Sequence, residues 1–165
     1  MRKTVAIVAG IAILVLVNWT VFQRERLLTN GRTVLLELAP ADPRSLMQGD
    51  YMALRFKLAD QVFGRGLARE VADGRIVVSV GEHGVGSFVR HDAGELLASG
   101  EVRMRYRVRE GRVKFATNAY FFQEGTAGAY ARARYGEFRV AADGDMLLTH
   151  LVSEQFKRLG PVARY

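Results

Sequence analysis

The chain of 165 residues contains no cysteine and only three histidines. Without cysteine it can form no disulfide bond, thiolate zinc site or cysteine nucleophile, although this absence leaves the redox compartment open. The histidines, His83, His91 and His150, follow no compact spacing of metal ligands, so we expect neither a metal site nor a cofactor. Folding must therefore rest on packing within the chain.

A second absence is that of charge near the amino terminus, where Thr4–Phe22 contains no charged residue. Val5–Val17 is apolar apart from Gly10. At about 1.5 Å per residue the uncharged stretch reaches roughly 28 Å as a helix, which is close to the hydrocarbon thickness of a bilayer. Trp19 is typical of a membrane interface. The pattern predicts a transmembrane anchor over residues 1–22.

The alternative to an anchor is a cleaved signal peptide, since Arg2 and Lys3 form a basic start before the apolar run. Residues 18–23 lack the small-x-small pattern that cleavage needs, so we expect the segment to be retained. The short basic tail favours an amino terminus inside the cell, which would place the rest of the chain outside the cytoplasm.

The remaining chain has the composition of one folded domain. The whole sequence is 49% hydrophobic and 25% charged, which is typical of a globular protein. The formal net charge is +7, and without Arg2 and Lys3 the 24 cationic residues fall to 22 against 17 acidic ones, or +5. Such a balance favours anionic partners: lipid headgroups, nucleic acid or an acidic protein face. We expect a short stalk over residues 23–31, a domain over 32–159 and a tail over 160–165.

Alternation of apolar and polar residues predicts a mainly β domain. Strands are predicted over Thr33–Ala39, Asp50–Leu58, Arg75–Val80, Gly86–His91, and in two hairpins, one within Val102–Phe122 and one joining Glu137–Ala142 to Met146–Val152. A short helix is predicted over Thr126–Tyr135, closed by Gly136. Strands with so little helix between them indicate an antiparallel sheet curled as a sandwich or a small barrel.

A period of two also follows Gly49. It assigns Met52, Leu54, Phe56 and Leu58 to the core, and Tyr51, Ala53, Arg55 and Lys57 to the outer side.

A cationic ladder occupies the outer side of the predicted central hairpin. A two-residue turn at Glu110-Gly111 would place Tyr106 opposite Phe115 and Val108 opposite Val113 on the inner side. The ladder consists of Arg103, Arg105, Arg107, Arg109, Arg112 and Lys114. Opposed like charges are destabilising, so we expect compensation by acidic residues of the chain, lipid phosphate or a partner. A nucleic-acid surface is disfavoured, because the aromatic residues point to the other side.

The segment Gly49-Asp50-Tyr51-Met52-Ala53-Leu54-Arg55-Phe56 resembles the signature of the GDYXXLXY protein family, with Phe56 where the pattern ends in tyrosine. Leu38–Gln48, Phe121–Thr126 and Ala133–Val140 also resemble this family. The resemblance implies a bacterial protein with one membrane span and a soluble domain, often encoded beside a multi-pass membrane protein and without an established activity. It implies no catalytic residues, and the core position predicted for Phe56 makes the missing hydroxyl unimportant.

Several residues near the signature are candidates for binding. Gly49 and Asp50 most simply form the turn and cap that begin a strand. In the functional alternative, Asp50 and Tyr51 belong to the polar rim of a ligand or peptide groove. The full candidate set is Asp42, Arg44, Gly49, Asp50, Tyr51, Leu54, Arg55 and Phe56.

Catalysis is not expected, because no nucleophile and base can be paired. Ser45 before Gly49-Asp50 resembles the arrangement in serine-lysine peptidases, but the gap is shorter, and Lys57 and Lys114 lie on outward faces.

The main hypothesis is a non-catalytic accessory protein of the bacterial cytoplasmic membrane. Its domain would be periplasmic or extracellular, with the bilayer and a multi-pass membrane protein as partners. The alternatives are a membrane-bound hydrolase using Ser45 or Asp50, and a cytosol-facing domain that binds anionic lipid or nucleic acid through the cationic ladder.

Overall fold

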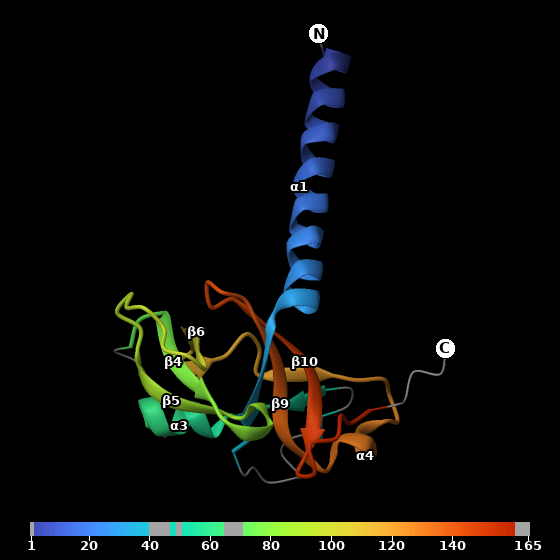
Figure 1. Ribbon diagram of the computed structural model, residues 1–165. Coiled ribbons are helices and arrows are strands. Elements are labelled where there is room, and N and C mark those ends of the chain that lie inside the picture. The colour runs from blue at the N-terminus through green and yellow to red at the C-terminus, as the bar shows by residue number, and fades with distance from the viewer. Residues whose placement is uncertain (1, 40–46, 49–50, 65–70, 161–165) are drawn as a thin grey trace.

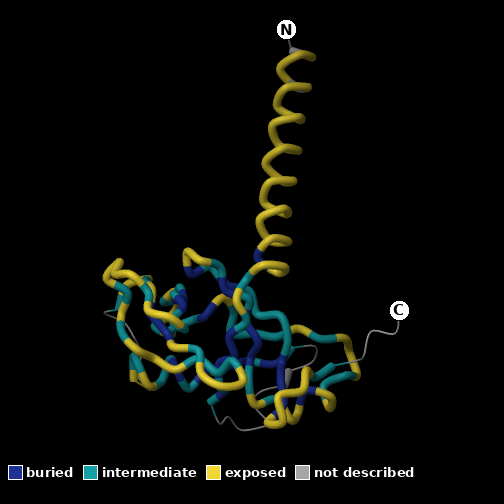
Figure 2. The backbone as a smooth tube through the Cα atoms, in the orientation of Figure 1, coloured by how far each residue is buried: buried dark blue, intermediate teal, exposed yellow. Residues whose placement is uncertain are grey.

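The computed structural model describes residues 2–39, 47–48, 51–64 and 71–160. Its most prominent feature is one long helix, α1 (Arg2–Asn30), which projects from a β-rich domain (Figure 1). The described side chains of α1 are exposed except that of Leu27, which packs at the base of the helix (Figure 2). This helix is long and apolar enough to cross a membrane. It runs unbroken to Asn30, so most of the segment predicted as a stalk is helical.

Among the described residues, the domain contains short strands and three short helical segments. The strands are β1 (Arg32–Glu37), β2 (Met47–Gln48), β3 (Tyr51–Ala53), β4 (Gly74–Val80), β5 (Gly86–His91), β6 (Glu101–Arg109), β7 (Arg112–Lys114), β8 (Ala119–Phe121), β9 (Ala133–Val140) and β10 (Met146–Ser153). The helical segments are α3 (Lys57–Phe63), the 3₁₀ turn η1 (Glu82–Gly84) and α4 (Ala127–Tyr130).

The described strands form three antiparallel sheets. Their strand orders are β1-β9-β10, β2-β3-β8 and β5-β4-β6-β7. Strand β1 connects them, because Leu38 at its end bridges to Phe56 and Leu35 bridges to Val85. The sheets therefore curl round one core as a half-barrel, and the prediction of a mainly β, curled antiparallel fold is confirmed (Figure 1).

The predicted core face of the signature segment is confirmed, since the four residues assigned to it, Met52, Leu54, Phe56 and Leu58, are all buried. The strand predicted to continue to Leu58 is wrong: β3 ends at Ala53, and α3 begins at Lys57. Leu58 and Val62, four residues apart, both pack against the core, as on one side of a helix. The buried position of Leu58 fits both the period of a strand and that of a helix, so alternation alone could not locate the change from strand to helix.

The helix predicted over Thr126–Tyr135 is also too long, because α4 has only four residues and β9 begins at Ala133. Gly136 is a strand residue and not a helix cap. A Cβ atom there would lie 3.0 Å from Leu148 Cδ1 and 3.0 Å from Phe56 Cε1. This position needs glycine because two core side chains lie directly above the backbone.

The central hairpin has the predicted register: Arg107 lies opposite Lys114, Val108 opposite Val113, and Arg109 opposite Arg112. Its turn contains two residues in the left-handed region, Glu110 with φ 54° and Gly111 with φ 68°. The pairing predicted between Tyr106 and Phe115 is wrong, because β7 ends at Lys114. Phe115 instead turns into the core, where it is fully buried.

Three further predictions are confirmed in outline, although β9 begins at Ala133 and not at Glu137. Strand β2 was not predicted, and β8 pairs with β3 and not within the central hairpin. Strands β4 and β5 correspond to the two predicted before residue 92, and β9 and β10 form the predicted terminal hairpin.

Candidate functional site

Segments distant in sequence meet around Phe56, which is 2% exposed. Its ring centroid lies 5.3 Å from that of Phe138 on β9 and 6.2 Å from that of Phe115, both in edge-on geometry. Leu38 pairs with it through a β-bridge, and Gly136 lies below the ring. Three of the four segments quoted above for the family resemblance thus share one packing centre. A tyrosine hydroxyl at position 56 would need its own partner there, and phenylalanine needs none.

We use the name motif surface for four residues: Tyr51 and Arg55 of the signature, together with Asp60 and Phe121. Tyr51 on β3 lies opposite Phe121 on β8, and their ring centroids are 5.9 Å apart. Phe121 is 73% exposed. Arg55 donates hydrogen bonds to both carboxylate oxygens of Asp60, each at 3.0 Å. Exposed aromatic rings and arginine are both suited to contact with a protein.

Two of the candidate binding residues have a different role. Leu54 and Phe56 are buried, so they stabilise the domain and offer no surface to a partner. Tyr51 and Arg55 lie on the outer side, as predicted. The remaining candidates lie outside the described residues; they are Asp42, Arg44, Gly49 and Asp50. Ser45 also lies outside them, so the hydrolase hypothesis stays a prediction.

Sequence reasoning missed two residues of the motif surface. Phe121 lies in a segment that resembles the family, but only the pairing of β3 with β8 brings it beside Tyr51. Asp60 follows Arg55 by five residues in sequence, and it reaches the guanidinium group because α3 turns the chain back. No period in the sequence indicates that contact.

Three of the six residues of the cationic ladder, Arg103, Arg105 and Arg109, are paired with acids of the domain. Asp92, whose side chain is 4% exposed, accepts a hydrogen bond from Arg103 Nε at 3.1 Å and pairs with Arg75 at 3.5 Å. Arg105 pairs with Asp145 at 2.7 Å.

At the turn end of the hairpin, Arg109 pairs with Asp73 at 3.0 Å. The expected anionic compensation therefore comes from loops around the sheet. Within the part of the chain that the structure describes, Arg107, Arg112 and Lys114 make no ion pair.

These pairs affect the titration of the acids. Burial raises the pKa of Asp92, but the hydrogen bonds from the Gly94 amide and the Arg103 side chain outweigh it, so that pKa lies below its usual value. The pKa of Asp73 is also lowered, chiefly by the Val108 amide and then by Arg109. Both carboxylates are therefore ionised at neutral pH.

A second charged cluster centres on Glu137, which is 5% exposed. Arg158 donates two hydrogen bonds to its carboxylate, each at 2.8 Å, and His150 Nδ1 lies 3.7 Å away. Burial raises the pKa of Glu137, but the Arg158 hydrogen bond and charge lower it overall. Burial also lowers the pKa of His150, which is therefore neutral at pH 7. The cluster ties the segment after β10 to the sheet.

The described residues contain no group of three or more histidines or acids placed to hold a metal ion. A shallow hollow on one side of α1 is lined by Ile11, Leu14, Val15, Asn18, Trp19 and Phe22. This lining carries no acid or base, so it has no means of general acid–base catalysis.

Comparison with curated proteins and comparison with solved structures each found no match. The sequence profile described as GDYXXLXY protein matches residues 13–151, from within α1 to within β10. That match covers most of the chain, including the signature and the segments that meet around Phe56. The chain belongs to the GDYXXLXY protein family.

Proposed function

We propose that this protein is a membrane-anchored, non-catalytic binding protein of the bacterial cell envelope. Helix α1 acts as a signal anchor in the cytoplasmic membrane, with its amino terminus inside. The β-domain lies on the periplasmic or extracellular side. There the motif surface binds a multi-pass membrane protein.

The anchoring proposal is supported by the surface of α1. Its large apolar side chains from Val5 to Phe22 are all at least half exposed, so no part of the domain covers them. Burying one such side chain contributes about 1.5–3 kcal/mol, and a bilayer would bury them all. Basic residues at both ends of the apolar run suit the headgroup regions, with Arg24 and Arg26 at the domain end.

The observation that carries the binding proposal is the aromatic pair in the motif surface, in which Phe121 is exposed and Tyr51 is half-buried. Large exposed aromatic rings and arginine are enriched at protein interfaces, where rings fill pockets on the partner. Phe121 offers such a ring next to Tyr51, and the ion pair with Asp60 holds Arg55 in one orientation. Resemblance to a family encoded beside multi-pass membrane proteins supports that class of partner.

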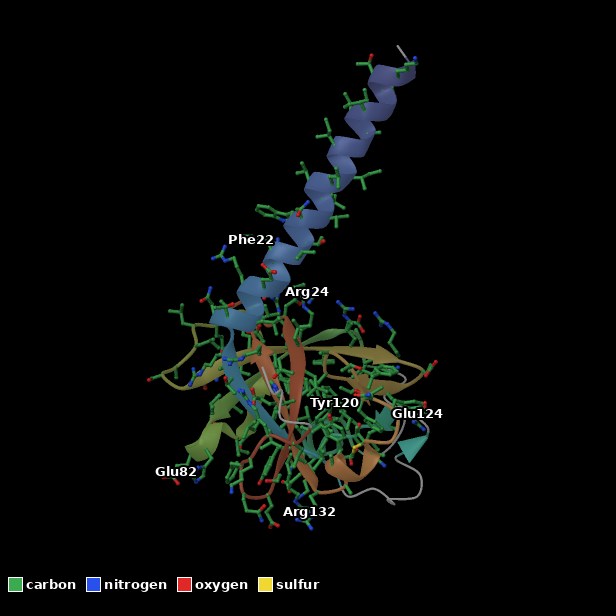
Figure 3. All side chains as sticks on the ribbon, turned by 90° about the vertical axis from the view of Figure 1, so that its right-hand side faces the viewer. Phe22, Arg24, Glu82, Tyr120, Glu124 and Arg132 are labelled. Carbon is green, nitrogen blue, oxygen red and sulfur yellow. The ribbon has the colours of Figure 1, made fainter. Side chains whose placement is uncertain are left out.

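Photo-crosslinking in living cells tests this proposal. A photoreactive amino acid replaces Phe121, and the matched control replaces Glu82. Glu82 lies on the opposite side of the domain from Glu124, which follows Phe121 by three residues (Figure 3). We expect one crosslinked membrane-protein product from position 121 and none of that mass from position 82. Both positions are exposed, so the fold is not at risk.

Variants of the motif surface complete the test. Tyr51→Ala combined with Arg55→Glu is expected to reduce the product from position 121 at least fivefold while the protein remains in the membrane fraction. Equal crosslinking from both positions, or a product unchanged by the double variant, would assign the partner contact to another surface.

A further inference from the structure

The loop between β5 and β6, residues 92–100, exposes a leucine to an unusual degree. Leu96 is 95% exposed, more than any other large apolar side chain that the structure describes. A single exposed leucine on a flexible loop would mean little. The structure around this loop gives it more significance.

Ion pairs hold the β5–β6 loop in a fixed conformation. Arg103 bonds to the carboxylate of Asp92 and to the carbonyl oxygen of Glu95. Arg90 donates to Glu95 at 3.0 Å and to Glu101 at 2.6 Å. These contacts link both ends of the loop to the outer side of the sheet.

Backbone hydrogen bonds add to this restraint. The Gly94 amide bonds to Asp92, and the Ala98 amide bonds to Glu101 at 2.9 Å. The loop residues on both sides of Leu96 are therefore hydrogen-bonded, and this braced loop presents the Leu96 side chain to solvent. Such bracing lowers the entropy lost when an exposed side chain binds something.

The loop lies on the side of the domain from which α1 emerges. Figure 1 shows it rising to the level of the helix base, as does the β9–β10 turn. The guanidinium group of Arg32, two residues after the end of α1, bonds to the carbonyl oxygen of Glu101 at 3.4 Å. Where α1 spans a bilayer, this side of the domain faces the lipid surface.

The length of the helix beyond its apolar part brings the loop close to the bilayer. The eight-residue step from Phe22 to Asn30 is about 12 Å along a helix. A headgroup layer occupies roughly 5–8 Å on each side of the hydrocarbon core. Transmembrane helices are tilted by about 20° on average, and a tilt toward the loop brings it nearer to that layer.

We propose that the β5–β6 loop is a second membrane contact, in which Leu96 inserts into the interfacial layer of the leaflet beside α1. This inference rests on the proposed anchoring of α1. The bilayer is the favoured occupant because α1 tethers the loop beside it permanently, at a fixed level. Two attachment points would restrict rotation of the domain and fix the direction in which the motif surface faces.

Tryptophan fluorescence of the full chain in vesicles tests the proposal. Trp19→Phe removes the single native tryptophan. Leu96→Trp then reports on the loop, and Glu82→Trp reports on an exposed site far from α1 (Figure 3). The vesicles contain phosphatidylcholine with brominated acyl chains, which quench only fluorophores that reach the lipid. We expect emission from Leu96→Trp to be shifted to the blue and quenched at least twofold more than emission from Glu82→Trp.

Flotation of the same vesicles separates the two proposals. A chain that floats while Leu96→Trp shows no more quenching than Glu82→Trp would keep the anchor and overturn the loop contact. A blue shift without quenching would also overturn it, since the loop would then contact a second copy of the chain. A chain that does not float would contradict the anchoring and the loop contact together.

Discussion

At the scale of single residues, the signature divides into a buried part that holds the domain together and an exposed part. Phe56 belongs to the first, with rings of two other segments at its edge and the backbone of Gly136 below it. Exposed Arg55 and half-buried Tyr51 belong to the second. Substitutions in the two parts should therefore have different effects, one on stability and the other on binding.

Gly136→Ala is expected to destabilise the domain by about 1–3 kcal/mol, because the added methyl group would overlap Leu148 and Phe56 in a packed core. Thermal unfolding of the full chain in detergent, followed by circular dichroism, measures the change. Gly128→Ala is the matched control, since nothing lies within 4 Å of a Cβ atom there. Equal melting temperatures for the two variants would contradict the packing described for Phe56.

Glu137→Gln is expected to destabilise the domain by roughly 1–3 kcal/mol at pH 7, because Arg158 loses a charged partner. The folded-state pKa of Glu137 lies below its usual value of 4.5, so its stabilisation is present above pH 4.5 and is lost as pH falls through the folded pKa. The difference in stability between wild type and variant should therefore shrink between pH 7 and pH 3.

Thermal unfolding at both pH values, with exposed Glu154→Gln as the control, measures this difference. A difference that grows on acidification would mean that the carboxyl group is protonated in the folded protein.

Residue-level prediction from the sequence succeeded where alternation applies and failed for charge partners. Alternation identified the buried side of the signature and the outward arginines of β6. The acids that pair with those arginines come from loops before β4, after β5 and between β9 and β10. Only the folded topology determines which of the 17 acidic residues reaches which arginine.

At the scale of elements, the β6–β7 hairpin has a turn in which both central residues have positive φ, as in type I′. Glu110 is strained there, because its Cβ atom disfavours the left-handed region. Glu110→Asn is expected to stabilise the domain by roughly 0.5–1 kcal/mol, since asparagine adopts this conformation readily.

Glu110→Gln is the control for this prediction, because it removes the same charge without the conformational preference. Melting temperatures of the two variants are compared in the same detergent. If the two variants melt at the same temperature, any change from wild type comes from the loss of charge and not from the backbone conformation.

The ends of elements were the least predictable part of the fold. The change from β3 to α3 passes through Phe56, an extended residue before a helix whose buried Leu58 fits both periods. Gly136, which was expected to end a helix, lies within β9, where the side chains of Phe56 and Leu148 pack against its backbone. Local patterns cannot distinguish a helix cap from a close contact made by a residue 80 positions earlier.

At the scale of the whole molecule, one apolar helix and one β-domain are held together at a small junction. Leu27 is buried at the base of α1, and Arg139 donates a hydrogen bond to the Gly31 carbonyl oxygen at 3.1 Å. The sequence predicted both parts, because an uncharged run and regular alternation are local signals. The motif surface and the braced β5–β6 loop needed the assembled sheets, since each joins residues from separate elements.

The central claim is that α1 crosses the cytoplasmic membrane and places the β-domain outside the cytoplasm. Fusing a reporter after Tyr165 that is active only outside, and in a second strain a reporter active only inside, tests it most directly. Activity of the outside reporter alone is the predicted result. Activity of the inside reporter alone would contradict the account, because the domain and its motif surface would then lie in the cytoplasm.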